Sequence, residues 1–348
     1  PKLIVHDLLA CVTSTMNLSR GQKNALTLML KGKNIFLTGP AGTGKSEIIN
    51  CFVKNRPRSK RVHITSTTGI SAIKIKGRTI HSFAGIGTGT ADVEVLITRI
   101  LKERPLKEKW RSVDVLIIDE ISMLSAELFD KLEAIARCVR QSVEPFGGIQ
   151  IILCGDFLQL PNVEGEFCFT AESWDSVVGN NTIELTEIMR QDNVQFQRCL
   201  NAVRIGAIDA DTRRLLEERV GAELDDSFSG ILPTRLFPTN REVDILNDEE
   251  LDKLAEAGRE FIEYEMKITP YPSVKTQWLD STIEQFVKRT IFPTSVQLCI
   301  DAQVMLLSNL DQDAGLVNGS RGVVTGFVEQ YPRVKFANGR EETITEAT

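Results

Sequence analysis

The chain has 348 residues, and its 41 Lys and Arg against 47 Asp and Glu give a formal net charge of −6. The share of hydrophobic residues, 42%, and of charged residues, 25%, excludes wholesale disorder, and no apolar run approaches the ~18 residues of a membrane span. The acidic total counts mildly against a simple electrostatic nucleic-acid binder. Seven scattered cysteines without a CxxC pair indicate reduced thiols in an intracellular compartment, and three distant histidines do not suggest a zinc site.

Short apolar runs in the first half of the chain predict the strands of a parallel sheet. These runs lie at 34–38, 62–65, 115–119 and 149–154. Runs that are apolar throughout are typical of strands buried on both faces. One helix is predicted between the last two strands, from the helical spacing of Leu124, Leu128, Leu132, Ile135 and Val139. Strands and helices in alternation predict an α/β fold from about residue 18 to residue 204.

The remainder of the chain changes character twice. The region 205–302 is polar, with predicted helices up to about residue 265 and a proline-containing, loop-rich stretch after it. From residue 303 to 348 the chain turns to β-branched residues and glycine, and Asn-Gly pairs at 318–319 and 338–339 are hairpin signals. This tail predicts a small antiparallel sheet, and residues 1–17 form an N-terminal extension.

The strongest motif lies where the first predicted strand meets a helix. The pattern G-x-x-x-x-G-K-[ST] is matched by Gly39, Pro40, Ala41, Gly42, Thr43, Gly44, Lys45 and Ser46. The glycines let backbone N–H groups curl around phosphates, and the helix N-terminus favours an anion. Lys45 is expected on the β and γ phosphates and the Ser46 hydroxyl on Mg²⁺. The motif therefore predicts a nucleoside triphosphate site; a plain glycine-rich turn, the alternative, does not call for the lysine and the serine.

Two further strand ends carry candidate catalytic residues. Asp119 and Glu120 follow a buried run, so they would emerge at the carboxyl edge of a central strand, where ligands bind in α/β sheets. Asp119 can hold Mg²⁺, and Glu120 can act as a general base for the attacking water. Gln159 is a candidate sensor of the γ-phosphate, against the ordinary alternative of an incidental turn glutamine. Arg190 is a candidate for stabilising charge on the transferring phosphoryl group, with a solvated helix arginine as an equal alternative.

The ordered set Gln22, 39–46, Asp119-Glu120, 155–161 (GDFLQLP) and Arg190 resembles superfamily 1 helicases. The stretch 119–133 (DEISMLSAELFDKLE) resembles the signature of the petite-integration-frequency (PIF) helicases of superfamily 1B. Further matching segments are 65–70, 79–83, 146–150, 239–241 and 315–322. The resemblance runs from about residue 18 to residue 324 and is weak through 205–300.

This resemblance implies a RecA-like ATP-binding motor domain over 18–204, with a small inserted loop or wedge subdomain around 83–112. A partial second RecA-like domain with a small antiparallel, SH3-like β insertion would follow. ATP and Mg²⁺ would drive 5′-to-3′ movement on single-stranded DNA, to unwind forked or G-quadruplex DNA in replication, recombination, repair and telomere maintenance. Gln22 would read the adenine edge, and Gln159 and Arg190 would couple the γ-phosphate to DNA movement. The resemblance also implies a monomer that needs no membrane and, if the source is eukaryotic, works in the nucleus or mitochondrion.

The resemblance also implies a set of DNA-facing residues. They are Thr65, Thr68, Gly69, His81, Ser82, Phe83 and Asn240. Hydroxyl and backbone N–H groups suit phosphate contacts, and Phe83 or His81 would stack on a base. A satisfied polar residue at a domain edge is the alternative for His81, and a turn asparagine is the alternative for Asn240. Two basic runs, 54–61 and 99–111, are interpreted as solvated faces and not as DNA sites.

Two late motifs of this family, roughly His-Lys-Ser-Gln-Gly and Ala-Leu-Ser-Arg, do not occur before Thr348. We therefore expect an incomplete second motor domain, and a fragment that binds ATP but hydrolyses it poorly. Two other functions stay open: a P-loop ATPase or nucleotide switch that needs no nucleic acid, and a RecD-like or conjugative-relaxase helicase. Stimulation of ATP turnover by single-stranded DNA separates a helicase from the nucleotide switch.

Overall fold

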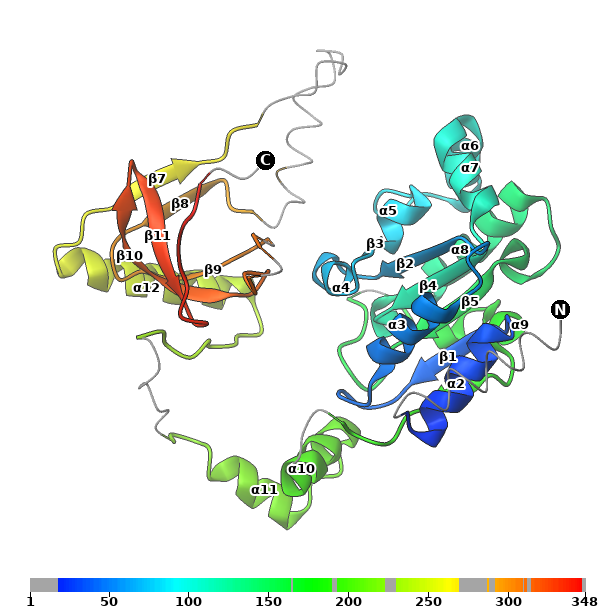
Figure 1. The fold of residues 1–348 in the computed structure, drawn as a ribbon, viewed down its shortest axis with the longest axis horizontal. Coiled ribbons are helices and arrows are strands. Elements are labelled where there is room, and N and C mark those ends of the chain that lie inside the picture. Colours follow the sequence, from blue (N-terminus) through cyan, green and yellow to red (C-terminus); the bar gives the residue numbers. More distant parts are fainter. Residues whose placement is uncertain are drawn as a thin grey trace. The chain divides into compact units, whose positions relative to one another are not determined.

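The computed structural model of the chain describes residues 18–163, 165–189, 193–222, 230–268, 287, 292–308, 310–311 and 314–345. The chain divides into two compact units after Val220, and each unit is described by itself (Figure 1). In these described ranges, no helix is long and apolar enough to cross a membrane. The predictions for residues 1–17, for most of the loop-rich stretch before residue 293 and for Arg190 lie outside the described residues.

The first unit is built on a six-stranded parallel sheet with the order β3-β2-β4-β5-β1-β6. Its strands are β1 (Ile35–Thr38), β2 (Val62–Ser66), β3 (Arg78–Thr79), β4 (Val115–Asp119), β5 (Gln150–Cys154) and β6 (Thr182–Glu184). The predicted strands are the central four, which confirms the α/β fold class. The sequence did not indicate the edge strands β3 and β6, because two or three paired residues are too short to show an apolar run.

Helices cover both faces of this sheet, so the first unit has two cores (Figure 1). Successive strand residues point to opposite faces, and in β4 Val115 and Ile117 therefore join one core while Leu116 and Ile118 join the other. The first core packs against α2 (Arg20–Leu30) and α3 (Lys45–Asn55). The second core packs against α5 (Ile80–Ala84), α6 (Val93–Lys102), α7 (Arg104–Ser112), α8 (Ala126–Arg140) and α9 (Trp174–Val178).

Shorter elements complete the first unit. They are α4 (Gly69–Lys74), the 3₁₀ turns η1 (Ile121–Met123), η2 (Pro145–Gly148) and η3 (Cys168–Thr170), and the helices α10 (Val194–Ile205) and α11 (Ala210–Glu217). The predicted apolar repeat forms α8, which begins after Ser125, whose side chain accepts a hydrogen bond from the Leu128 N–H. Leu124 lies in the turn before this helix.

The segment around 83–112, predicted as an inserted loop or wedge, is mostly helical. Helices α6 and α7 bury Leu96, Ile100 and Trp110 in the same core as α8. The indole N–H of Trp110 donates to the Ala84 carbonyl oxygen at 3.2 Å, which ties α7 to α5. These helices are therefore part of the first unit's own core, and the glycine-rich stretch that follows α5 is a short connection to α6.

The second unit contains α12 (Asn240–Glu256) and two antiparallel sheets. The smaller pairs β7 (Ile262–Glu265) with β8 (Ser295–Leu298). The larger has the order β12-β11-β10-β9, from β9 (Gln303–Met305), β10 (Arg321–Val328), β11 (Tyr331–Phe336) and β12 (Glu341–Thr343). This sheet confirms the predicted antiparallel tail. The described residues of this unit contain no parallel sheet, so the second RecA-like domain stays a prediction.

The hairpin signals are confirmed in part. The pair at 338–339 forms the turn between β11 and β12, and the pair at 318–319 lies in the connection from β9 to β10. The tight turn from β10 to β11 is formed by Glu329 and Gln330, both with positive φ. Neither residue type is a usual choice for that conformation, so this turn could not be predicted from its residues.

Candidate nucleotide and nucleic-acid site

A glycine-rich loop joins the carboxyl end of β1 to the N-terminus of α3. The φ angles of Gly39, Gly42 and Gly44 are 134°, 83° and 84°, which disfavours any residue with a side chain. A Cβ atom on Gly39 would lie 2.1 Å from the Leu185 carbonyl oxygen, so the loop also has no space for one. The loop therefore has the backbone form that the phosphate motif predicts, with the first free N–H groups of α3 at its end.

Lys45 folds over this loop. Its Nζ donates to the carbonyl oxygens of Gly39, at 2.6 Å, and Pro40, at 3.0 Å. The Thr43 hydroxyl donates to the same Pro40 oxygen at 2.9 Å. Phosphate oxygens carry charge and accept stronger hydrogen bonds than neutral carbonyls, so the ammonium can exchange these partners for a phosphate. Ser46 is exposed in the first turn of α3, where its hydroxyl is accessible to a metal ion.

Gln22 braces the loop from α2. The residue is 3% exposed; its Oε1 accepts from the Ser19 N–H at 2.9 Å and its Nε2 donates to the Thr43 carbonyl at 3.0 Å. The first bond is half of a capping box at the start of α2. The predicted contact of Gln22 with the adenine edge stays a prediction, and in this structure both polar ends of its amide bind backbone.

The carboxylates lie at the end of β4. Asp119 is 6% exposed, and its Oδ1 accepts from the Glu120 N–H at 2.9 Å. Glu120 is left-handed, with φ 55° and ψ 45°, a conformation that costs a residue with a side chain about 1 kcal/mol. The Thr67 hydroxyl donates to the Glu120 carbonyl at 3.0 Å and stabilises this turn. The chain thus turns sharply out of the strand after Asp119.

Cys154, at the end of the neighbouring strand β5, lies near the charged side chains of the site. Its thiol is fully buried, and burial is the main reason that its pKa is raised. Asp119 and Glu120 raise this pKa further, whereas Lys45 lowers it. Charges from the phosphate loop and from both carboxylates therefore act on one buried point. Lys45, Asp119 and Glu120 thus lie close enough to this thiol for their charges to act on it, and their catalytic roles stay predictions.

The third strand end carries a carboxylate that sequence analysis did not single out. Asp156 is 1% exposed and accepts from Nε of Arg204 at 2.6 Å and from Nη2 at 2.8 Å. Burial alone would raise the pKa of Asp156, but hydrogen bonds from Arg204 and from the Leu158 N–H outweigh it, and the pKa is lowered. The exposed Gln159 side chain also donates to this carboxylate, at 3.4 Å. Asp156 therefore links the loop of Gln159 to helix α10.

The segment before Arg190 lies against the phosphate loop. The Met189 N–H donates to the Gly42 carbonyl at 2.8 Å, and the Leu185 N–H donates to the Thr38 carbonyl at 2.8 Å. These bonds bring the neighbour of Arg190 to the nucleotide site, while Arg190 itself lies outside the described residues. Its role stays a prediction.

The residues present fit Mg²⁺ that is bound together with a nucleotide. Within the described ranges, no three His, Cys, Asp or Glu side chains gather as a metal site. Mg²⁺ in phosphoryl-transfer sites is held by one or two protein oxygens, water and the substrate phosphates. Ser46 and Asp119 are the protein oxygens available at this site.

Two of the predicted DNA contacts are buried, which corrects their roles. Thr65 is 0% exposed and its hydroxyl donates to the Ile117 carbonyl at 2.7 Å, inside the sheet. Phe83 is also 0% exposed, with its ring 5.0 Å from the His63 ring and 5.2 Å from the Trp110 ring. Phe83 is therefore a core residue in this structure and does not present a face to a base. Within one such segment, an exposed residue can be followed directly by a buried one, as Ser82 is followed by Phe83.

The other predicted DNA contacts are accessible or partly accessible. Gly69 and Ser82 are exposed, Thr68 and His81 are half-buried, and burial lowers the pKa of His81, which favours its neutral form. Thr68 and Gly69 directly follow the carboxyl end of β2, and Ser82 lies on α5. Asn240 is exposed as the first residue of α12, in the second unit. Their contacts with DNA stay predictions.

Comparison with known proteins identifies the family. Residues 17–214 match the model of the PIF1-like helicase family, and residues 287–327 match that of the 2B domain of DNA helicase Pif1. Protein 030L of Invertebrate iridescent virus 6 is 44% identical, with 94% of this chain and 67% of that protein covered. ATP-dependent DNA helicase PIF1 of Danio rerio is 42% identical, with 94% of this chain and 50% of that protein covered. The chain thus spans between half and two thirds of the length of these relatives.

Solved structures agree with this assignment. The crystal structure of Pif1 helicase from Candida albicans matches with a TM-score of 0.79 at 35% identity, covering 94% of this chain and 78% of that one. Pif1 from Bacteroides, in complex with ADP-AlF3 and ssDNA, matches with a TM-score of 0.59 at 27% identity, covering 94% and 74%. The six-stranded sheet of the first unit is accordingly a RecA-like helicase core. The chain belongs to the PIF1-like helicase family.

Proposed function

We propose that this chain contains the ATPase motor of a DNA helicase that moves 5′-to-3′ on single-stranded DNA. The observation that carries this proposal is the geometry at the carboxyl edge of the parallel sheet. Lys45 folds over a loop whose positive-φ positions are glycines at the end of β1, and Asp119 and Glu120 lie at the end of β4 in the same sheet. The relatives named ATP-dependent DNA helicase PIF1 support the activity. The Bacteroides structure with ADP-AlF3 and ssDNA supports both ligands.

In this proposal the first unit prepares ATP for hydrolysis. Backbone N–H groups of 39–46 and the Lys45 ammonium hold the β and γ phosphates, where they stabilise charge that develops during phosphoryl transfer. Ser46 and Asp119 would hold Mg²⁺, which would neutralise phosphate charge when bound. Glu120 accepts a proton from the attacking water. Gln159 senses the γ-phosphate, and its bond to Asp156 connects it to α10.

The DNA strand is held by small polar groups in this proposal. Thr68, Gly69 and Ser82 offer hydroxyl and backbone N–H donors to phosphates, and such contacts position a strand without reading its sequence. Forked DNA and G-quadruplexes are the proposed substrates, genome maintenance is the proposed role, and the working form is a monomer. These parts of the proposal follow from the family resemblance.

The test is ATP turnover by the chain and its Lys45→Ala variant, with and without single-stranded DNA. We expect the low ATP turnover of the wild type to rise when single-stranded DNA is added. Lys45→Ala should lose this turnover and keep the melting temperature, because among the described residues Lys45 donates to the loop carbonyls of Gly39 and Pro40. Lys33→Ala, which removes an exposed lysine after α2, is the matched control. Wild-type turnover in Lys45→Ala would show that the phosphate site is misassigned.

Polarity is tested with forked DNA that carries only a 5′ tail or only a 3′ tail. Unwinding from the 5′ tail is expected, and unwinding from the 3′ tail alone would contradict the proposal. The burial of Thr65 and Phe83 favours one alternative, a P-loop ATPase that does not need DNA. ATP turnover that is indifferent to added strands would select that alternative.

A further inference from the structure

A shallow groove lies beside α7 and the N-terminal end of β2, away from the nucleotide. Its volume is about 630 Å³, and its lining residues are Arg61, His63, Pro105, Glu108, Lys109, Arg111 and Ser112. Arg61 belongs to the first basic run of the sequence, whereas Lys109 and Arg111 belong to the second. The fold thus joins two charge runs, each of which looks like an ordinary solvated face in the sequence, on one surface.

The groove is lined by three cationic side chains and one acid, Glu108. In the part of the chain that the structure describes, Arg61, Lys109 and Arg111 take part in no ion pair. Two acids near these cations are shared with cations outside the groove lining. Glu108, which lines the groove, pairs with Arg104 at 2.9 Å, and Asp114, which accepts from the Arg61 N–H at 2.9 Å, pairs with Lys60 at 3.5 Å. The groove therefore keeps an uncompensated positive charge, although the whole chain is acidic.

Repulsion within this group shows in its titration. Burial lowers the pKa of His63 most, and Arg78 and Lys109 lower it further. The pKa of Lys109 is also lowered, by burial and then by Arg78, with Glu103 opposing. Cations that destabilise one another in the free protein gain when an anion binds among them. Arg78 is exposed on the edge strand β3, which pairs with β2, the strand that carries His63, so it lies on the same positive surface.

The groove is continuous with a segment expected to contact DNA. Lys109 Nζ donates to the Ser82 carbonyl at 3.4 Å and lies 5.3 Å from the centre of the Phe83 ring. The groove offers no exposed aromatic face, because its one ring, His63, packs against the buried Phe83. Single-strand sites normally combine cations with rings that stack on bases, whereas contacts to a duplex backbone need only cations and polar groups.

We propose that this groove, with Arg61, Lys109, Arg111 and the adjacent Arg78, binds the sugar-phosphate backbone of duplex DNA next to the single-stranded track. This inference rests on the proposed function. It makes the groove a contact that holds the unwinding junction without reading sequence, and its strength must depend steeply on salt.

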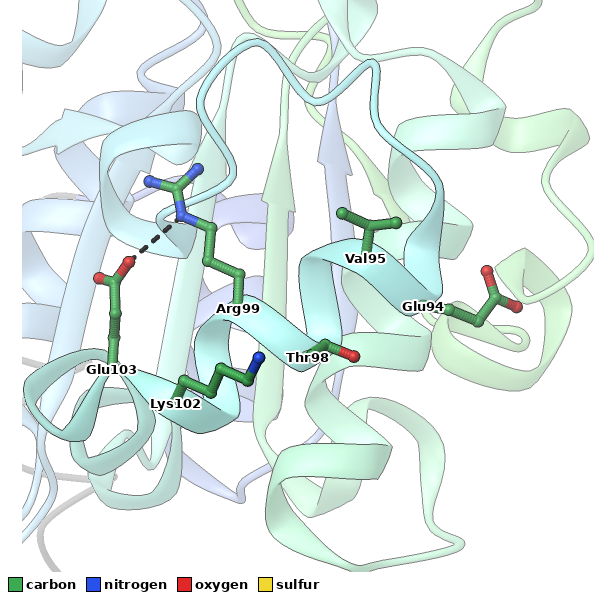
Figure 2. A pocket seen from close by; sticks show the side chains of 6 residues that line it. All are labelled: Glu94, Val95, Thr98, Arg99, Lys102 and Glu103. Carbon is green, nitrogen blue, oxygen red and sulfur yellow. Dashed lines mark hydrogen bonds and ion pairs between the residues drawn. The ribbon is translucent and has the colours of Figure 1, made fainter. Parts of the chain in front are cut away.

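A second hollow on the same subdomain provides the contrast. It lies on α6, has a volume of about 570 Å³ and is lined by Glu94, Val95, Thr98, Arg99, Lys102 and Glu103 (Figure 2). Arg99 is ion-paired there with Glu103 at 3.2 Å, and a second acid, Glu94, also lines the hollow. The lining of this hollow holds two cations and two acids, so it carries no excess positive charge. Replacing its two cations changes the net charge of the chain as much as replacing two cations of the groove.

The test compares Arg61→Gln/Lys109→Gln with the control Arg99→Gln/Lys102→Gln in the full chain. Affinity for a blunt duplex and for a single strand is measured by fluorescence anisotropy across a salt series. For the groove variant we expect about 10-fold weaker duplex binding and a salt slope lower by about 2, because two phosphate contacts are lost. Single-strand binding should change by about 2-fold or less, and the control should change neither affinity by more than about 2-fold.

A second variant guards against misfolding. Arg78→Gln replaces an exposed side chain that makes no ion pair among the described residues, and we expect about 3-fold weaker duplex binding with an unchanged melting temperature. Equal losses in the groove variant and the control would show an effect of net charge and overturn the inference. Equal losses of affinity for duplex and for single-stranded DNA would assign the groove to the path of the single strand. That result would overturn the proposed duplex contact. A wild type that binds no DNA would instead overturn the proposed function.

Discussion

Arg204 binds both oxygens of the Asp156 carboxylate, with Nε 2.6 Å from Oδ2 and Nη2 2.8 Å from Oδ1. Asp156 is the second residue after β5, and Arg204 lies near the end of α10, 48 residues later. The Asp156 side chain is 1% exposed and that of Arg204 is 16% exposed. This pair therefore ties the loop of Gln159 to the helix that leads toward the second unit.

Removing the arginine should destabilise the first unit markedly. We expect Arg204→Gln to lower the free energy of unfolding by about 3 kcal/mol, because it leaves a buried carboxylate without its cation. Arg214→Gln breaks the exposed pair with Asp211 on the adjacent α11 and should cost about 0.5 kcal/mol or less. Urea unfolding at neutral pH measures both. Similar costs for the two variants would show that the Asp156 pair is not a structural clamp.

The same pair should give an acid-dependent stability. The pKa of Asp156 is below its ordinary value in the fold, so its contribution is complete above the pKa of the unfolded chain, about 4, and is lost as pH falls through the folded pKa. Without Arg204, burial raises this pKa, so the variant prefers a protonated Asp156. The stability difference between wild type and Arg204→Gln should therefore shrink from neutral pH toward pH ~4. A difference that grows in acid would contradict this assignment.

The parts of the site that could be predicted from the sequence are those that lie on contiguous residues. The phosphate loop, the central strands and the pair Asp119-Glu120 each carry their signal in a short stretch, because a buried strand must be apolar and a phosphate loop must be glycine-rich. Arg204 and the groove were not predictable in this way. Each depends on residues tens of positions apart that only the fold brings together, and each of their arginines looks like a solvated one in the sequence.

Burial distinguishes the residues within a segment that resembles a DNA-facing motif. Phe83 and Thr65 belong to segments that resemble DNA-facing motifs, yet one completes an aromatic cluster and the other bonds across the sheet. A segment alternates between inward and outward side chains, so a motif does not say which of its residues face the ligand. The exposed neighbours Ser82 and Thr68 keep the predicted role open.

Gly39 gives a sharp test of the phosphate loop. Gly39→Ala would place its Cβ 2.1 Å from the Leu185 carbonyl oxygen at a φ of +134°, so we expect a loss of about 2 kcal/mol or more and of nucleotide binding. Gly32→Ala is the control, because Gly32 has a φ of +75° but nothing within 4 Å of a Cβ. The control should cost about 1 kcal/mol and keep nucleotide binding. Calorimetric titration with ADP and a urea series measure both effects, and normal ADP binding by Gly39→Ala would refute this close packing.

Gln22 should contribute to stability as well as to nucleotide binding. Gln22→Ala removes the side chain that accepts from the Ser19 N–H and donates to the Thr43 carbonyl, so we expect a loss of about 1 kcal/mol together with weaker ATP binding. Affinities for ATP and GTP show whether the amide also reads adenine, since only such a contact would weaken ATP selectively. A loss confined to ATP, with unchanged unfolding, would contradict the bracing role seen here.

His63 offers a direct reporter for the groove. Its pKa is lowered by burial and then by Arg78 and Lys109, so Lys109→Gln should raise this pKa in the free protein, and duplex DNA should raise it in the wild type. In the unfolded chain the pKa is higher, about 6.5, so the neutral ring stabilises the fold above that pH and the benefit is lost as pH falls toward the folded pKa.

Ring resonances of the three histidines can be followed by NMR through a pH titration. His81, whose pKa is lowered by burial alone, is the internal comparison, and it should not respond to Lys109→Gln. Duplex DNA should raise the His63 pKa in the wild type and much less in Arg61→Gln/Lys109→Gln, because phosphates bound by these cations oppose the positive field at the ring. A His63 pKa that is unmoved by saturating duplex would place the DNA backbone elsewhere on the molecule.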